Sequence, residues 1–255
     1  MGASGRAHVN KYDLERYKRQ IALEGWGKQG QVKLAATSIF IAGAGGLGSS
    51  VAFHLAGAGV GTLRIADRDK VELSNLNRQI LHNEARIGMP KAKSAQQTLT
   101  AFNPSIKVIT EEAEITAANI AVLAAQPDLV IDCLDNLKTR LVLNEYCCGT
   151  NIPLVHAGLW GLTGQVTFIH PPETPCLRCI FPRSLPKNST PVAGVTAGVI
   201  GSFQAMEALK YLTGIGTLLK GKMLCFDGSD MSINQLQLSR DPKCKTCASL
   251  TRMKD

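Results

Sequence analysis

The sequence of 255 residues is 45% hydrophobic and 19% charged, a composition and length that suit one large domain with a buried core. The formal net charge of +8 favours acidic partners, either protein or nucleic acid, and we find no internal repeat or low-complexity segment. We therefore expect a single domain over residues 1–255.

The amino-terminal residues, MGASGRAHVN, lack the apolar stretch of a secretory signal. The longest weakly polar region, residues 193–212, is interrupted by Gln204, Glu207 and Lys210 and is too polar to span a bilayer. We therefore expect a cytoplasmic protein without a membrane anchor.

The first half of the chain alternates strand and helix signals after a helical arm in residues 1–35. The expected strands are SIFIAG (38–43), TLRIAD (62–67), IKVIT (106–110) and DLVIDC (128–133), with helices near 46–57, 90–101, 116–124 and 136–148. This alternation is typical of a parallel sheet covered by helices on both faces. The sequence predicts an α/β, Rossmann-like, doubly wound and mostly parallel sheet, with a nucleotide-binding half over residues 36–150.

The second half has a different texture. IPLVHAGL and GQVTFIH are expected strands, the proline-dense PPETPCLRCIFPRSLPKNSTP is an expected loop, and KMLCFD and INQLQL are expected to complete the sheet as additional strands. Between them, VAGVTAGVIGSFQAMEALKYL predicts a helix that Gly214 ends. Its many small residues indicate close packing, either in the core or against a second subunit.

The segment IAGAGGLGSS carries a glycine motif. Gly43, Gly45 and Gly48 fit the pattern G-x-G-x-x-G, and Gly46 adds a fourth glycine. Residues without Cβ let backbone N–H groups and the positive end of the next helix approach a phosphate. Asp67, at the end of the second strand, would bond ribose hydroxyls. The motif indicates a nucleotide but does not separate NAD from ATP or FAD, and a glycine turn without a ligand is the alternative.

The connection after Asp67 is long and polar. It carries Asn75, Arg78 and Gln79, and then Lys91 at the start of the next helix. A dehydrogenase has no need of this arrangement, whereas cations around a triphosphate neutralise charge on the leaving pyrophosphate. The alternative is that Arg78 and Lys91 are solvated surface charges.

The segment VIDCLDNLKTR places Asp135 at the carboxyl end of the fourth strand, beside the crevice where open α/β sheets bind ligands. A carboxylate there can hold Mg²⁺ against phosphates. Asp135 could instead cap the helix that starts near Asn136. Asp132 is expected to face the edge of the sheet or to cap locally.

Four of the eight cysteines form two C-x-x-C pairs, Cys176 with Cys179 and Cys244 with Cys247. Such pairs meet in folded proteins as tetrahedral thiolate sites, so we expect one structural Zn²⁺. Two redox-active dithiols or disulfides are the alternative. The remaining cysteines are expected to be buried and inert, and two histidines are expected to be packing or polar-network residues: Cys133, Cys147, Cys148 and Cys225, with His54 and His156.

These motifs together resemble a known family. RYKRQIALEGWGKQGQ, GAGGLGS, DRDKVELSNLNRQ, GMPKAKSA, DCLDN and GQV followed by PCLRC are similar to segments of the adenylyltransferases of the ThiF and MoeB type, which activate ubiquitin-like sulfur carriers. The resemblance runs from about Arg16 to Cys247. It implies an adenylation domain whose second half, residues 151–255, binds the carrier and forms a homodimer.

The resemblance also implies roles for individual residues. ATP would lie on the glycine loop 43–48, with its ribose on Asp67 and its phosphates near Asn75, Arg78, Gln79 and Lys91. Asp135 would be the Mg²⁺-linked acid. Arg19 resembles an arginine that reaches the phosphates from the other subunit. Residues 181–192 would form a lid, although a plain surface loop is the alternative.

The implied substrate is a small β-grasp carrier with a carboxyl-terminal Gly-Gly, whose carboxylate attacks the α-phosphate and releases pyrophosphate. The loop IFPRSLPKNSTPVAG lacks the cysteine that some relatives use to link the carrier covalently, so we expect the reaction to stop at the acyl-adenylate and a separate protein to donate sulfur. The alternatives are a relative that adenylates a carboxylate on a tRNA nucleoside, with nucleic acid the less favoured partner, a nicotinamide oxidoreductase, and a non-catalytic nucleotide-binding scaffold.

Overall fold

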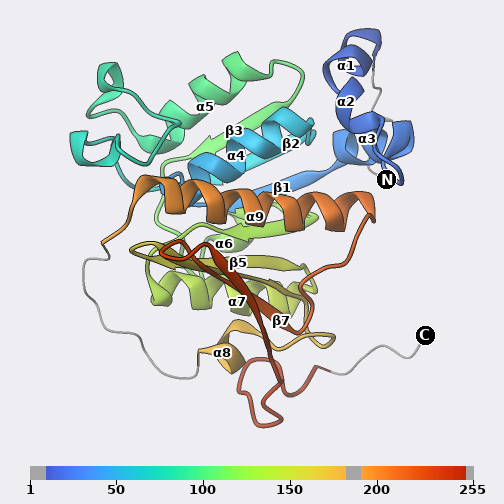
Figure 1. The fold of residues 1–255 in the computed structure, drawn as a ribbon. Coiled ribbons are helices and arrows are strands. Elements are labelled where there is room, and N and C mark those ends of the chain that lie inside the picture. Colours follow the sequence, from blue (N-terminus) through green and yellow to red (C-terminus); the bar gives the residue numbers. More distant parts are fainter. Residues whose placement is uncertain (1–9, 182–190, 251–255) are drawn as a thin grey trace.

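The computed structural model describes residues 10–181 and 191–250 (Figure 1). In this part of the chain, eight strands form one sheet in the order β3-β2-β1-β4-β5-β6-β7-β8. Strands β1 to β5 pair in parallel, and β6, β7 and β8 continue the same sheet with antiparallel pairing. The expected mostly parallel α/β sheet with additional carboxyl-terminal strands is confirmed. The strands are Ser38–Ala42 (β1), Thr62–Ala66 (β2), Lys107–Glu111 (β3), Leu129–Asp132 (β4), Leu154–Trp160 (β5), Thr163–Ile169 (β6), Lys222–Asp227 (β7) and Ser232–Gln237 (β8).

Helices cover both faces of the sheet. The larger apolar layer takes side chains from α3, α4, α5 and α9, and the smaller layer takes them from α6, α7 and α8. None of the described helices is long and apolar enough to cross a membrane. The helices are Lys11–Arg16 (α1), Lys18–Ile21 (α2), Gly27–Ala36 (α3), Gly46–Ala58 (α4), Lys91–Phe102 (α5), Ile120–Ala124 (α6), Leu137–Thr150 (α7), Leu177–Ile180 (α8) and Gly194–Thr213 (α9).

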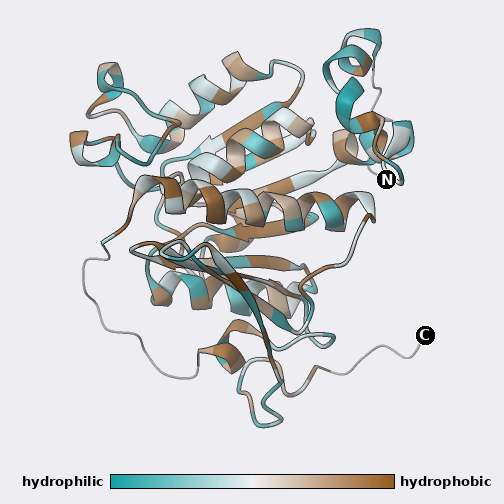
Figure 2. Cartoon of the chain, in the orientation of Figure 1, coloured by the Kyte–Doolittle hydropathy of each residue, from teal (hydrophilic) through white to brown (hydrophobic). Residues whose placement is uncertain are grey.

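Strand β1 shows why the central strands are apolar throughout. Ile39 and Ile41 face the larger layer, while Phe40 and Ala42 face the smaller one. All four are at most 1% exposed, because successive side chains of a strand point to opposite faces and both faces are covered. Burial of each large apolar side chain contributes about 1.5–3 kcal/mol. Figure 2 accordingly shows hydrophobic colours along the central strands and hydrophilic colours on much of α1 and α2.

The small residues of α9 pack against α4 of the same chain. A Cβ atom at Gly201 would lie 2.8 Å from the Cβ atom of Ser50, and one at Gly46 would lie 3.0 Å from that of Ala197. The two helices therefore approach closely enough to exclude larger side chains. Figure 1 shows α9 lying across the sheet beside α4. The core-packing interpretation of this helix is confirmed.

The amino-terminal arm packs at the carboxyl end of α4. Gly59 ends that helix with a φ of +82°, and a Cβ atom there would lie 2.5 Å from the Tyr17 ring. The buried Asn103 side chain donates to the Tyr17 hydroxyl at 2.8 Å, and Gln20 donates to the Ala58 carbonyl at 2.7 Å. These contacts hold α1 and α2 at the carboxyl end of α4, away from its amino end.

Asp132 is not at the edge of the sheet, so of the two expected roles only the local cap is found. Its side chain is fully buried at the end of β4 and contacts His156 Nδ1 at 2.6 Å and Arg140 Nε at 3.5 Å. It also accepts a hydrogen bond from the Leu134 N–H at 3.0 Å. Burial opposes ionisation, but Arg140 and His156 outweigh it and hold the pKa of Asp132 below its usual range. His156 is thus a buried polar-network residue, as expected.

Replacing Asp132 by Ala should lower the free energy of unfolding by about 3–5 kcal/mol, because Arg140 and His156 would lose their buried partner. Asp128→Ala is the matched control, since that exposed carboxylate also accepts a backbone N–H, from Ser38 at 2.8 Å. Urea unfolding followed by circular dichroism measures both variants. Equal losses in the two variants would contradict the assignment of the main stabilisation to the buried network.

Candidate functional site

The candidate site lies where the strand order reverses. Strand β1 pairs with β2 on one side and with β4 on the other, so the loops that follow β1 and β4 lie together at the carboxyl edge of the sheet. This edge is where open α/β sheets form their ligand crevice. A Cβ atom at Gly43 would lie 2.9 Å from the Cys133 carbonyl oxygen, which shows how closely the two loops approach.

The glycines of the loop 43–48 serve a tight strand-to-helix turn. Gly43 has a φ of +100°, which L side chains rarely adopt. A Cβ atom at Gly48 would lie 2.0 Å from the Gly43 carbonyl oxygen, so α4 can pack on the turn only with glycine there. Gly45 caps α4 without a side-chain hydrogen bond. The first N–H groups of this 13-residue helix thus have no side-chain cap and form the kind of terminus that binds anions.

Asp67 lies directly beside this turn. One carboxylate oxygen accepts the Ala44 N–H at 2.7 Å, and the other accepts the Asp69 N–H at 2.8 Å. Burial raises the pKa of the carboxyl group, and these two hydrogen bonds oppose that rise. Asp67 therefore braces the glycine loop as well as standing at the end of β2.

The polar segment after β2 folds over the start of α4. It contains two short 3-10 helices, Leu73–Asn75 and Glu84–Arg86. The Arg78 Cγ atom lies 3.5 Å from the position that a Cβ atom at Gly46 would take. The Arg78 guanidinium donates to the Ser74 carbonyl at 2.9 Å. The structure therefore brings Arg78 to the glycine loop, as the sequence predicts.

Asn75 and Gln79 are both buried in this segment. Asn75 Oδ1 accepts the Glu72 N–H at 3.1 Å, which fixes the first 3-10 turn. The Gln79 amide nitrogen lies 3.7 Å from the position of a Cβ atom at Gly45, so this side chain faces the glycine loop. Within the described part of the chain, Gln79 Oε1 is a buried acceptor without a hydrogen-bond partner.

Lys91 is not a solvated surface charge. Its side chain is 8% exposed, and its Nζ lies 3.1 Å from an Asp69 oxygen, while its own N–H donates to the Asp69 carbonyl at 2.8 Å. It begins α5, as Pro90 before it suggests. Asp69 lies two residues after Asp67, whose carboxylate holds the Asp69 N–H just after β2. Through Asp69, Lys91 is held near the same edge of the sheet.

Asp135 is exposed in the loop between β4 and α7. Its nearest hydrogen-bond partner is the Asn136 amide at 3.4 Å. Asn136 itself caps α7, because its side chain accepts the Thr139 N–H at 2.9 Å. The interpretation of Asp135 as the helix cap is therefore wrong. An exposed carboxylate at this loop has oxygen atoms of the kind that Mg²⁺ prefers.

Arg19 is exposed on α2 and lies away from the glycine loop of its own chain. The neighbouring Tyr17 and Gln20 pack on Gly59 and Ala58, at the carboxyl end of α4. The glycine loop is at the amino end of that 13-residue helix, which spans about 20 Å. The family resemblance assigns Arg19 to the phosphate site of the other subunit, and within one chain the fold keeps Arg19 away from the glycine loop.

Two further residues of the site are missed by the sequence analysis. His82 is buried, with Nε2 2.9 Å from the Ala44 carbonyl oxygen and Nδ1 2.9 Å from Ser94 Oγ. Arg140 donates to the carbonyls of Leu134 and Ala157 at 2.5 Å and 3.0 Å. Both act on backbone groups that come close only after folding, so no local pattern identifies them.

The two C-x-x-C pairs meet at the far side of the molecule. Their four Sγ atoms all lie within 4.8 Å of one another, and three of the sulfur pairs are 3.5–3.9 Å apart. Zn–S bonds of about 2.3 Å place the sulfur atoms of a tetrahedron about 3.8 Å apart, so the geometry fits a zinc ion. Disulfides would need sulfur atoms about 2 Å apart, and all eight cysteines are free thiols. The cluster consists of Cys176, Cys179, Cys244 and Cys247.

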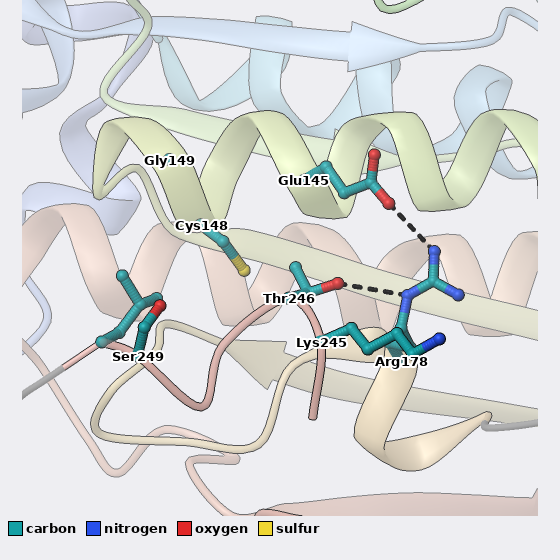
Figure 3. A pocket seen from close by; sticks show the side chains of 8 residues that line it. Glu145, Cys148, Gly149, Arg178, Lys245, Thr246 and Ser249 are labelled. Carbon is teal, nitrogen blue, oxygen red and sulfur yellow. Dashed lines mark hydrogen bonds and ion pairs between the residues drawn. The ribbon is translucent and has the colours of Figure 1, made fainter. Parts of the chain in front are cut away.

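A pocket of about 600 Å³ lies against this cysteine cluster (Figure 3). Arg178 crosses it, donating to Glu145 at 2.9 Å and to Thr246 Oγ1 at 3.1 Å, so it ties the two cysteine pairs to α7. Cys148 also lines the pocket. The pocket is separate from the glycine loop, which lies near the opposite end of α7.

The cysteines outside the cluster are poor nucleophiles. Burial strongly raises the pKa of Cys133 and of Cys147, which keeps both thiols protonated. Cys148 is buried against the cysteine cluster. The expectation of burial is wrong for Cys225, which is only half-buried on β7, although burial still raises its pKa.

The predicted lid at residues 181–192 lies mostly outside the described residues, which stop at Phe181 and resume at Pro191. The Pro191 carbonyl accepts the Gly161 N–H at 2.7 Å, so the chain re-enters the fold beside the turn between β5 and β6. The lid remains a prediction.

Proteins similar in sequence align with most of this chain. A maize protein named adenylyltransferase and sulfurtransferase MOCS3-1 is 43% identical over 241 residues, 92% of this chain and 52% of that protein. The molybdopterin-synthase adenylyltransferase of Escherichia coli K12 is 41% identical over 247 residues, 94% of this chain and 99% of that protein. The chain thus spans about half the length of the MOCS3 relatives and nearly all of the bacterial one.

The fold is also found among solved structures. The crystal structure of E. coli MccB superposes with a TM-score of 0.84 at 22% identity and covers 98% of this chain and 76% of that one. At this identity the similarity concerns the fold alone. Residues 17–246, nearly the whole sequence, match the ThiF family. The chain therefore belongs to the ThiF family.

Proposed function

We propose that this chain is an ATP-dependent adenylyltransferase that activates the carboxyl-terminal Gly-Gly of a small ubiquitin-like sulfur carrier. The observation that carries the proposal is the glycine loop, whose uncapped helix terminus lies beside Arg78, with Lys91 held near the same edge of the sheet. Cations grouped around a helix terminus suit a triphosphate. The names of the relatives, adenylyltransferase in both cases, support the same reaction class over a nicotinamide oxidoreductase.

In the proposed reaction, the carrier carboxylate attacks the α-phosphorus of ATP. One oxygen–phosphorus bond forms and the bond to the leaving pyrophosphate breaks, which gives an acyl-adenylate and pyrophosphate. The glycine loop would hold the phosphates, Asp67 the ribose, and Asn75 and Gln79 would border the phosphates. Arg78 and Lys91 would stabilise the charge that develops on the leaving group. No covalent intermediate on the enzyme is needed, in keeping with the buried, high-pKa thiols of Cys133 and Cys147.

Two metals belong to the proposal. Asp135 would hold Mg²⁺, which would screen the phosphate charges when bound. The four cysteines would hold a structural Zn²⁺, whose four protein ligands leave no open position for substrate.

We further propose that the protein is a homodimer in which Arg19 serves the site of the partner, because the arm keeps Arg19 away from its own glycine loop. Sulfur would come from a separate protein, and the site would operate in the cytoplasm.

The direct test is pyrophosphate exchange into ATP, measured with a Gly-Gly β-grasp carrier, with tRNA, and with neither. Exchange that depends on the carrier is expected. Exchange that depends on tRNA would instead favour adenylation of a nucleoside carboxylate, and no exchange with either would contradict adenylyl transfer. Removal of the last glycine of the carrier should abolish exchange, since its carboxylate is the proposed nucleophile.

Asp135→Ala should reduce carrier-dependent exchange by at least about a hundredfold, the loss of one electrostatic contribution to a phosphoryl-type transition state. Stability should change little, because the side chain is exposed. Asn136→Ala is the matched control: it removes the cap of α7, at a cost of about 1 kcal/mol, and should leave exchange nearly intact. Near-normal exchange by Asp135→Ala would refute the role of this carboxylate.

A mixture of Arg19→Ala and Asp135→Ala subunits should regain exchange, because one site of each heterodimer then receives both intact residues. The control mixes the double variant with the wild type, and its heterodimers should be inactive at both sites. If Arg19 acts in its own subunit, the two mixtures give the opposite pattern: the first stays inactive and the second keeps one active site. Native mass spectrometry confirms subunit exchange.

Metal analysis should find about one zinc ion per chain, as four thiolates around one tetrahedral ion require. Cys244→Ser should lose the metal and lower the unfolding temperature, because the site ties the carboxyl-terminal segment to the loop after β6. Cys225→Ser, which changes a thiol outside the cluster, should keep both. Stoichiometric zinc in Cys244→Ser, or its absence from the wild type, would contradict the site.

A further inference from the structure

His82 links the glycine loop to the helix that begins with Lys91. Its side chain is 7% exposed and lies in the polar segment between β2 and α5. Both ring nitrogens are engaged, Nε2 with the Ala44 carbonyl oxygen and Nδ1 with Ser94 Oγ, each at 2.9 Å. The proposed reaction described above assigns no role to this histidine.

The partners decide where the ring proton lies. The Ala44 carbonyl can only accept a hydrogen bond, so Nε2 must carry a hydrogen. The Ser94 hydroxyl can donate, so Nδ1 accepts from it in the neutral ring. Burial lowers the pKa of His82, and the nearby cations Lys91 and Arg86 lower it further, which favours this neutral form. The histidine thus uses one nitrogen for the loop and the other for α5.

The peptide groups of Ala44 are fixed from two directions. Its N–H donates to Asp67 at 2.7 Å, and its carbonyl accepts from His82. Ala44 is flanked by Gly43 and Gly45, which have no side chains to brace the turn. Backbone hydrogen bonds hold the two glycines, from Gly43 N–H to the Ala66 carbonyl and from Ser49 N–H to the Gly45 carbonyl, and the two polar contacts of Ala44 fix the peptide groups between them.

The other side of His82 is anchored on α5. Arg86 donates to the Ser94 carbonyl at 2.9 Å and to Thr98 Oγ1 at 2.5 Å, which holds the first turns of the helix in place. Ser94 lies three residues after Lys91, one turn along the same helix. A displacement of the loop relative to this helix would change the distance between the loop N–H groups and the Lys91 ammonium group.

We propose that His82 is a positioning residue for ATP: its Nε2–H holds the Ala44 carbonyl and thereby aims the N–H groups of the glycine loop at the phosphates. The proposal rests on the proposed function for the identity of the nucleotide. His82 does not touch the nucleotide, so its effect reaches the phosphates only through the backbone of the loop. Small displacements of a positioned phosphate are costly to binding and to reaction geometry.

Two amide variants separate the two nitrogens. In His82→Gln the side-chain amide reaches the place of Nε2, so it can still donate to Ala44, whereas in His82→Asn it reaches only the place of Nδ1 and can bond Ser94. Titration calorimetry with ATP and Mg²⁺ should give a Kd about five- to tenfold higher for His82→Asn than for His82→Gln, the effect of one lost hydrogen bond. His82→Gln should stay within about twofold of the wild type.

Further variants guard against a purely structural explanation. Ser94→Ala removes the partner of Nδ1 and should leave ATP affinity within about twofold of the wild type, because the bond to Ala44 remains. His54→Asn changes an exposed histidine whose Nε2 lies 3.0 Å from Ser202 Oγ, and should have no effect. If neither His82 variant folds, as judged by circular dichroism, Ser94→Ala decides alone: an ATP affinity lowered at least fivefold would overturn the proposal.

The ATP-binding measurement tests the role of His82 separately from the proposed function. ATP binding is measured without carrier, so a wild type that binds ATP but shows no carrier-dependent exchange contradicts the function and leaves the His82 comparison intact. Equal Kd values for His82→Asn and His82→Gln, or weaker binding by His82→Gln, would overturn the positioning role. A wild type that does not bind ATP would overturn both.

Discussion

The rest of the structure depends on the contact between α4 and the turn that precedes it. The position of a Cβ atom at Gly48 lies 2.0 Å from the Gly43 carbonyl oxygen, so the first turn of the helix rests on the end of β1 with no side chain between them. This contact fixes the direction of α4, which in turn packs along α9 and receives the amino-terminal arm at Gly59. Because the same turn leaves helix N–H groups without a side-chain cap, the feature that organises the fold also forms the anion-binding end of the site.

Polar side chains around this turn have two kinds of work. Asp67 and His82 hold the backbone of Ala44, whereas Arg78 and Lys91 supply positive charge. At the neighbouring loop, the buried Asp132 and the partly buried Arg140 hold the N–H and carbonyl of Leu134, one residue before the exposed Asp135. In both loops, buried groups fix the backbone beside a more exposed group, the half-buried Arg78 in the first and the exposed Asp135 in the second.

The cysteine cluster lies away from the glycine loop and the polar side chains around it. It joins the segment after β6 to residues 244–247, which follow β8, and Arg178 and Arg240 add hydrogen bonds across the same junction. The two segments are separated by 64 residues of sequence that include α9, β7 and β8, so a bound metal would join two segments that are far apart in the chain. The cluster is therefore suited to a structural role, as proposed, and it is separate from the site at the glycine loop.

The sequence by itself determined the alternation of strands and helices, the glycine turn and the two cysteine pairs, because each depends on residues close together in the chain. Tertiary structure alone decided the roles that join distant segments. Asp132 has a buried hydrogen-bond partner because β5 brings His156 to it, and Lys91 is buried because the segment before α5 folds back on Asp69. His82 contacts Ala44 across 38 residues of sequence, and the arm that carries Arg19 packs at the far end of α4. Such contacts depend on the register and packing of whole elements, which no local pattern of side chains encodes.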